Sequence, residues 1–155
     1  MKISISYFYQ IRFFKPNMIP VGTAIWPPKW FTKNGQIYKD KNGVYNGITC
    51  ADLQPGESCE GLCPCEEKPA QCAFLTTYRK QLDEIDFSAF WKWCESLCKY
   101  VQEKEKFAEE PEIVLIVFET PTNPCSERHP LIKWFADNGY ELKEWTKAQN
   151  NIALF

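Results

Sequence analysis

The pattern of hydrophobic and polar positions predicts strands at both ends of this chain and in its second half. Apolar and polar residues alternate over 2–7, as is typical of a strand, and a second strand is predicted over 19–25. The run 113–118 is apolar with no polar alternation, which indicates a strand covered on both faces of a parallel sheet. A last alternating segment, 140–145, predicts another strand.

Three helices are predicted between these strands. Residues 71–82 place apolar side chains on one side of a helix, and Asp86 is the expected N-cap of a longer helix that runs to about Lys106. Ser126 is the expected N-cap of a third helix, which ends before Gly139. The strands on either side of this third helix predict a βαβ unit with a right-handed crossover.

These elements predict an α/β fold, with a mainly parallel sheet flanked by helices and an irregular cysteine-rich loop. With 155 residues, 45% of them hydrophobic, the chain is expected to form one domain over 1–155. The alternating first residues are typical of a strand, not of a signal peptide, and no apolar stretch is long enough to span a bilayer. We therefore expect a soluble, cytoplasmic protein with no membrane partner. A net charge of −2 argues against a broad surface for duplex nucleic acid.

Residues 49–72 are rich in Cys, Pro, Gly and Glu and show neither helical nor strand periodicity. Such a segment cannot build its own core, so a cross-link is expected to hold it. Clustered thiols in a reducing compartment are more often metal ligands than disulfides, and we predict a zinc site here. The predicted ligands are Cys59, Cys63, Cys65 and Cys72, with Cys50 as a substitute. Disulfides, an iron–sulfur centre and unligated thiols are the alternatives.

The loop after the apolar strand carries the candidate catalytic residues. It contains Glu119, Cys125, Arg128 and His129, which is the only histidine of the chain. Ligands of open α/β sheets bind at the carboxyl edge, where this loop is expected to lie. Glu119 and His129 are acid–base candidates, and Cys125 is a candidate nucleophile. Each residue also has a structural interpretation: Glu119 pairing with Arg128, His129 capping the helix, and Cys125 packing as a small side chain.

A helix N-terminus near Arg128 predicts a site for an anion, such as the phosphate of a nucleotide or of a nucleic-acid end. The guanidinium of Arg128 would bind the anion, and Ser126 lies in the same turn. Arg12, Tyr7 and Lys29 are further ligand-binding candidates near the ends of the first two strands. Aromatic side chains there would stack on a nucleobase, or alternatively pack in the core.

Two separated blocks of the sequence resemble the bacterial and phage proteins of the domain of unknown function 488 family. The blocks contain Ser6-Tyr7-Phe8, Ile11-Arg12, Ile19-Pro20-Val21 and Pro28-Lys29-Trp30-Phe31, and then Glu119, Cys125, Arg128-His129 and Trp134. The resemblance implies an α/β fold and a shared pocket, but no activity. The family places its cysteine two residues before the arginine, with a histidine between them. Here Cys125 lies three residues before Arg128, with Ser126 and Glu127 between them.

Two functions follow as hypotheses. In the first, the protein is a hydrolase or transferase that acts on a nucleotide or nucleic acid at the carboxyl edge of its sheet. In the second, it is a zinc-stabilised interaction module, whose cysteine-rich loop binds a protein partner and whose βαβ unit is a scaffold.

Overall fold

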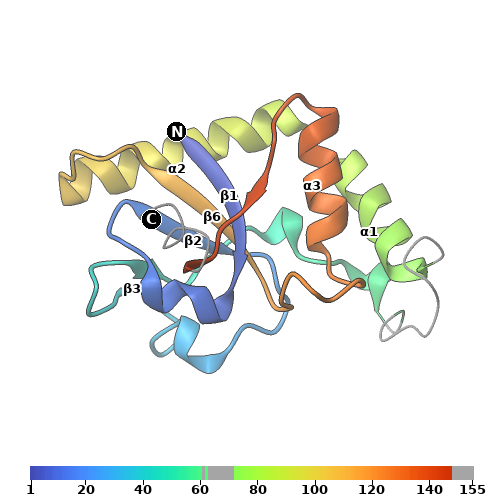
Figure 1. Ribbon diagram of the computed structural model, residues 1–155, viewed down its shortest axis with the longest axis horizontal. Helices are drawn as coiled ribbons and strands as arrows, with labels where there is room; N and C mark the ends of the chain where they lie inside the picture. Colours follow the sequence, from blue (N-terminus) through green and yellow to red (C-terminus); the bar gives the residue numbers. More distant parts are fainter. Residues whose placement is uncertain (61, 63–71, 148–155) are drawn as a thin grey trace.

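The structure is a computed structural model that describes residues 1–60, 62 and 72–147 (Figure 1). Its main sheet has five strands in the order β5-β2-β6-β1-β7, and all neighbouring strands are parallel. The strands are β1 (Lys2–Tyr7), β2 (Met18–Gly22), β5 (Ile48–Thr49), β6 (Glu112–Val117) and β7 (Lys143–Glu144). A small antiparallel hairpin is formed by β3 (Tyr38–Lys39) and β4 (Tyr45–Asn46). The predicted α/β class and parallel sheet are confirmed.

The central strand β6 is buried over its whole length. Ile113, Leu115 and Val117 pack in the larger hydrophobic cluster on one face, and Val114 and Ile116 pack in a second cluster on the other face. Both faces of this strand are therefore covered, which explains why its sequence shows no polar alternation.

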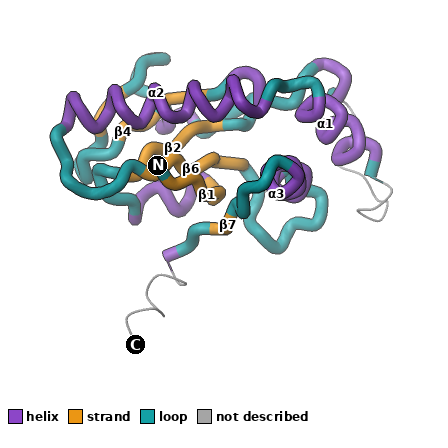
Figure 2. The backbone as a smooth tube through the Cα atoms, turned by 90° about the horizontal axis from the view of Figure 1, so that it is seen from above, coloured by secondary structure: helices purple, strands orange, loops and turns teal. Residues whose placement is uncertain are grey.

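One face of the sheet carries all three α-helices of the described chain. They are α1 (Ala73–Asp83), α2 (Phe87–Glu105) and α3 (Arg128–Asp137), close to the predicted bounds. Tyr78 of α1, Cys94 of α2 and Trp134 of α3 lie in one cluster with the strands. Figure 2 shows α2 running along the length of the sheet. No helix among the described residues has the length and apolar content needed to cross a lipid bilayer.

The opposite face is covered by short elements and by the hairpin. These include the 3-10 helices η1 (Phe8–Phe13) and η2 (Lys29–Phe31). Phe31 and Val44 are fully buried against this face. Two more 3-10 turns, η3 (Ala51–Leu53) and η4 (Glu57–Cys59), lie in the described part of the cysteine-rich segment.

Two predicted strands differ from the structure. The second strand ends at Gly22 instead of residue 25, and the bond from the Thr23 backbone N–H to the Ile116 carbonyl is the last of its ladder with β6. The last strand is only Lys143–Glu144, and it pairs with β1 instead of β6. β1 already occupies that side of β6 with six paired residues, so the βαβ unit passes over one strand.

The N-cap of α2 provides a test of the helix assignment. The Asp86 side chain accepts hydrogen bonds from the backbone N–H groups of Ser88 (3.0 Å) and Ala89 (3.3 Å). We expect Asp86→Ala to lower the free energy of unfolding by about 1 kcal/mol, because these N–H groups lose their acceptor. Urea denaturation measures this change. Asp86→Asn retains an acceptor and should cost less than half as much, so equal losses in both variants would contradict the capping role.

Candidate functional site

A cavity of about 320 Å³ lies where β2 and β6 end. Residues 24–26, which follow β2, and Phe118 and Glu119, which follow β6, line it. Glu127 at the N-cap of α3 also lines it. The carboxyl edge of a parallel sheet is the usual ligand site of this fold class, so this cavity is the candidate functional site.

Glu127 is the most deeply buried acidic side chain of the cavity, with 4% of its surface exposed. Among the described residues, only the Thr23 hydroxyl forms a hydrogen bond with its carboxyl group, at 3.0 Å. Burial, and next the nearby carboxylate of Glu119, raise the pKa of Glu127 to about 8. Glu127 therefore carries a proton at neutral pH.

The surroundings of Thr23 fit a protonated Glu127. Its hydroxyl oxygen lies 3.0 Å from Oε1 of Glu127 and 3.1 Å from the carbonyl oxygen of Ile116. A hydroxyl has one hydrogen and can donate to only one of these acceptors at a time. When Glu127 is protonated, its own O–H can donate to the Thr23 oxygen, and the Thr23 hydroxyl can then donate to the Ile116 carbonyl, which also accepts from the Thr23 backbone N–H.

Glu119, the second carboxyl group of the cavity, is half-buried. Its Oε2 accepts a hydrogen bond from the Ser126 hydroxyl at 3.2 Å. The same Ser126 oxygen accepts from the backbone N–H of Arg128 at 3.2 Å, so it caps the start of α3, although the helix begins one residue later than predicted. The predicted ligand-binding residue Ser126 is thus engaged within the protein.

Arg128 is a structural residue in this structure, with 2% of its surface exposed. Its Nε and Nη2 donate to the two carboxylate oxygens of Glu144 at 2.7 and 3.1 Å. Its Nη1 donates to the carbonyl oxygen of Glu119 at 2.8 Å and to the Ser126 hydroxyl. Each guanidinium nitrogen therefore bonds a protein oxygen. These bonds hold the loop, α3 and β7 together, and the binding of a ligand anion by Arg128 stays a prediction.

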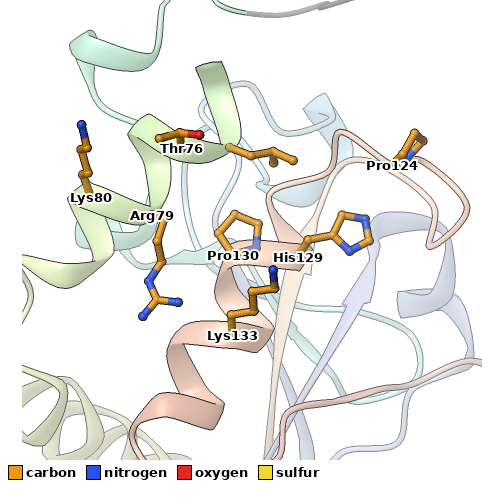
Figure 3. Close-up of a pocket in the computed structure, with 8 residues that line it drawn as sticks. Thr76, Arg79, Lys80, Pro124, His129, Pro130 and Lys133 are labelled. Atoms are coloured by element: carbon orange, nitrogen blue, oxygen red, sulfur yellow. The ribbon is translucent and has the colours of Figure 1, made fainter. Parts of the chain in front are cut away.

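The four candidate catalytic residues do not converge on one cavity. Glu119 lines the cavity at the sheet edge, whereas His129 lines a groove between α1 and α3 (Figure 3). The Nε2 atom of His129 lies 3.0 Å from the carbonyl oxygen of Asn123, a residue of the loop before α3. Cys125 is half-buried, its backbone N–H donates to Asn123 Oδ1, and it lines neither space.

The remaining ligand-binding candidates also lie away from this cavity. The Arg12 guanidinium stacks on the Tyr9 ring, 3.9 Å from its centroid, and lines a groove beside η1 and η2. Tyr7 accepts a hydrogen bond from Gln10 and packs against the helix-side core. Lys29 is exposed at the first position of η2. None of these three side chains lines the cavity at the sheet edge.

Of the four predicted zinc ligands, Cys63 and Cys65 lie outside the described residues. Cys59 and Cys72 are buried, and Cys59 lines the cavity. Burial raises the pKa of the Cys59 thiol, which favours its neutral form. Within residues 1–60, 62 and 72–147 there is no group of three or more side chains that could bind a metal ion. The zinc site stays a prediction.

Comparisons with protein families, curated proteins and solved structures found no match for this chain. The resemblance to the domain of unknown function 488 family therefore stays a prediction.

Sequence reasoning missed Glu127 and Glu144. The signal for Glu127 was a second acidic residue in the same loop, directly before the expected helix. Its burial depends on Thr23, more than 100 positions away in the sequence, so spacing alone could not show it. The sequence analysis considers Glu119, in the loop, as the partner of Arg128, whereas the carboxylate that pairs with it in the structure is that of Glu144 on β7.

The buried ion pair gives a direct stability test. We expect Arg128→Ala to lower the free energy of unfolding by about 3 kcal/mol or more, because Glu144 would lose its bidentate partner in a mostly buried position. Arg79→Ala is the matched control, since its partners Asp83 and Asp137 are largely exposed and the expected loss is about 1 kcal/mol or less. Urea unfolding of both variants measures the difference, and equal losses would contradict the structural role of Arg128.

Proposed function

We propose that this protein is a hydrolase or transferase that cleaves the glycosidic bond of a nucleoside or nucleotide unit in the cavity at the sheet edge. One observation carries the proposal: the buried carboxyl group of Glu127 lines the same cavity as the carboxyl group of Glu119. Two carboxyl groups, one protonated and one ionised, are the usual machinery for glycosidic bond cleavage.

Aromatic side chains at the cavity favour a planar ligand. Trp26 and Phe118 line it with 84% and 60% of their surfaces exposed, and Phe74 contributes a third ring. Exposed rings of this kind stack on nucleobases, with a gain of about 1–3 kcal/mol per base. A base held there would present its ring nitrogens to the carboxyl groups.

The cavity favours the neutral part of a nucleotide over its phosphate. The Glu119 carboxylate would repel an anion, and the nearby guanidinium of Arg128 is already bonded to Glu144. This observation modifies the predicted phosphate site: in the proposed complex the base and sugar occupy the cavity, and any phosphate lies outside it.

The proposed reaction uses the two carboxyl groups in different roles. Glu127 donates its proton to the leaving base nitrogen as the bond from that nitrogen to the anomeric carbon breaks. A water molecule attacks the anomeric carbon and gives a proton to the Glu119 carboxylate. The products are a free base and a sugar hydroxyl, and proton exchange with solvent restores both residues. In a transferase, an acceptor hydroxyl or base replaces the water.

Base release tests this proposal directly. We expect the purified protein to release free bases from a panel of ribonucleosides, deoxyribonucleosides and short oligonucleotides, as measured by liquid chromatography. Glu127→Gln should lower the rate by about 100-fold or more, because the amide cannot protonate the leaving base. Glu60→Gln is the matched control, since this exposed residue lines the mouth of the same cavity. No base release from the panel, or full activity in Glu127→Gln, would contradict the proposal.

The raised pKa of Glu127 also predicts how stability depends on pH. The unfolded chain loses this proton near pH 4.5 and the folded chain near pH 8, so between these values the folded state binds more protons. The contribution of Glu127 to stability is complete below pH 4.5 and is lost as the pH rises towards 8, with a slope of at most about 1.4 kcal/mol per pH unit.

Unfolding free energies of the wild type and Glu127→Gln, measured at several pH values, isolate this effect. The difference between them should fall between pH 4.5 and 8 and then level off. In Glu119→Gln the neighbouring charge is absent, so the levelling should occur at lower pH. A difference that does not vary with pH would show that Glu127 is not protonated in the folded state.

A further inference from the structure

The basic residues of this chain are concentrated in its first third. Residues 1–49 contain seven Lys or Arg and a single acidic residue, Asp40, although the whole chain has a net charge of −2. The rest of the chain is therefore strongly acidic. Such a separation of charge gives the protein a local positive surface that its net charge conceals.

The structure gathers four of these seven basic residues around a groove of about 590 Å³ on the sheet face opposite the α-helices. Four cations line it: Arg12, Lys33, Lys39 and Lys41. Lys33 and Lys41 are exposed and form no ion pair with any described residue, whereas Lys39 pairs with Glu105. The one acidic side chain of the groove, Asp40, already accepts hydrogen bonds from the hairpin.

The groove also offers groups that recognise bases. Trp30 lines it with 46% of its surface exposed, and the Tyr38 ring lies beside it. Asn46, only 1% exposed, lines it as well. Its Oδ1 is the one buried side-chain nitrogen or oxygen without a hydrogen-bond partner in the described part of the chain. Cations next to stacking rings are the usual combination in surfaces for single-stranded nucleic acid.

A row of rings connects this groove to the cavity at the sheet edge. The Phe8 ring, which lines the groove, lies 6.1 Å from the Trp30 ring and 6.1 Å from the Phe118 ring, centroid to centroid. Phe118 lines the cavity that contains Glu119 and Glu127. Phe8 is only 5% exposed, so the exposed rings of Trp30 and Phe118 both pack against this one buried ring.

We infer that the groove lined by Arg12, Lys33, Lys41 and Trp30 binds single-stranded nucleic acid, and that the substrate of the cavity is a base of this strand. The second part rests on the proposed function. The lysines contact backbone phosphates, Trp30 stacks on a base, and the next bases reach Phe118 and the two carboxyl groups.

The other basic groove of the molecule, between α1 and α3, lacks this combination. Lys80 and Lys133 face it, but its Arg79 is paired with Asp83 and Asp137 (Figure 3). Its walls contain Leu75, Pro124 and Pro130, and the ring that lines it belongs to His129, which is half-buried and lies within hydrogen-bond distance of the Asn123 carbonyl. Like the first groove, it contains two lysines that form no ion pair with any described residue, but no Trp or Tyr ring lines it, so it serves as a matched control.

Fluorescence anisotropy with labelled 12-nucleotide single strands, one DNA and one RNA, tests the inference. Lys33→Ala/Lys41→Ala should weaken binding by about 10-fold or more and reduce the slope of log K against log salt by about 1.4, since two phosphate contacts are lost. Lys80→Ala/Lys133→Ala removes the same charge from the other groove and should change binding less than about 2-fold. Both double variants replace exposed side chains, and circular dichroism confirms their folding.

Binding of either strand with this pattern supports the inference, and the preferred strand identifies DNA or RNA as the source. Equal losses in the two double variants, a duplex bound as tightly as the single strands, or no binding of either strand would overturn it. Base release from free nucleosides, measured on the same wild-type preparation, tests the proposed function separately. Base release without strand binding would contradict only the inference. Strand binding without base release would contradict the proposed function and the second part of the inference, and would leave the binding of a strand by the groove in place.

Discussion

The bidentate pair between Arg128 and Glu144 is the interaction on which the candidate site depends. It joins the first residue of α3 to β7 at the far edge of the sheet, and the same guanidinium binds the Glu119 carbonyl. Burying a guanidinium is costly unless all its nitrogen atoms are bonded, and here they are. Three segments that are separate in sequence are thereby fixed in one arrangement, and the loop between β6 and α3 keeps a defined shape.

This use of Arg128 determines the electrostatics of the cavity next to it. Because the guanidinium bonds to Glu144, it is not available to Glu127, which is buried one residue earlier with a hydroxyl as its hydrogen-bond partner. Burial then outweighs the attraction of the nearby positive charge, and Glu127 keeps its proton. The proposed acid thus owes its proton to its deep burial next to the Glu119 carboxyl group.

The sequence predicted the fold better than the site because the two depend on different ranges of interaction. Helices and the central strand follow from local periodicity, and α2 begins after its predicted cap Asp86. The two-residue strand β7 and its pairing with β1 depend on a competition between strands that local patterns do not contain. At the site, the loop and Glu119 follow from the sequence. The ion pair of Arg128 depends on Glu144, and the hydrogen bond of Glu127 depends on Thr23. Only the tertiary fold brings these partners near.

The unequal covering of the two sheet faces explains why the proposed binding surface lies where it does. Three helices cover one face and bury its side chains in a large core, so little of that side is left for a ligand except the gaps between helices. The other face is covered by η1, η2 and a short hairpin, which are too small to bury all their own rings and lysines. Trp30 and the cations of this face therefore reach the surface beside the sheet edge. In the proposed complex, the thinner layer would supply the groups that bind the strand, and the helical layer, through the N-cap of α3, would supply Glu127.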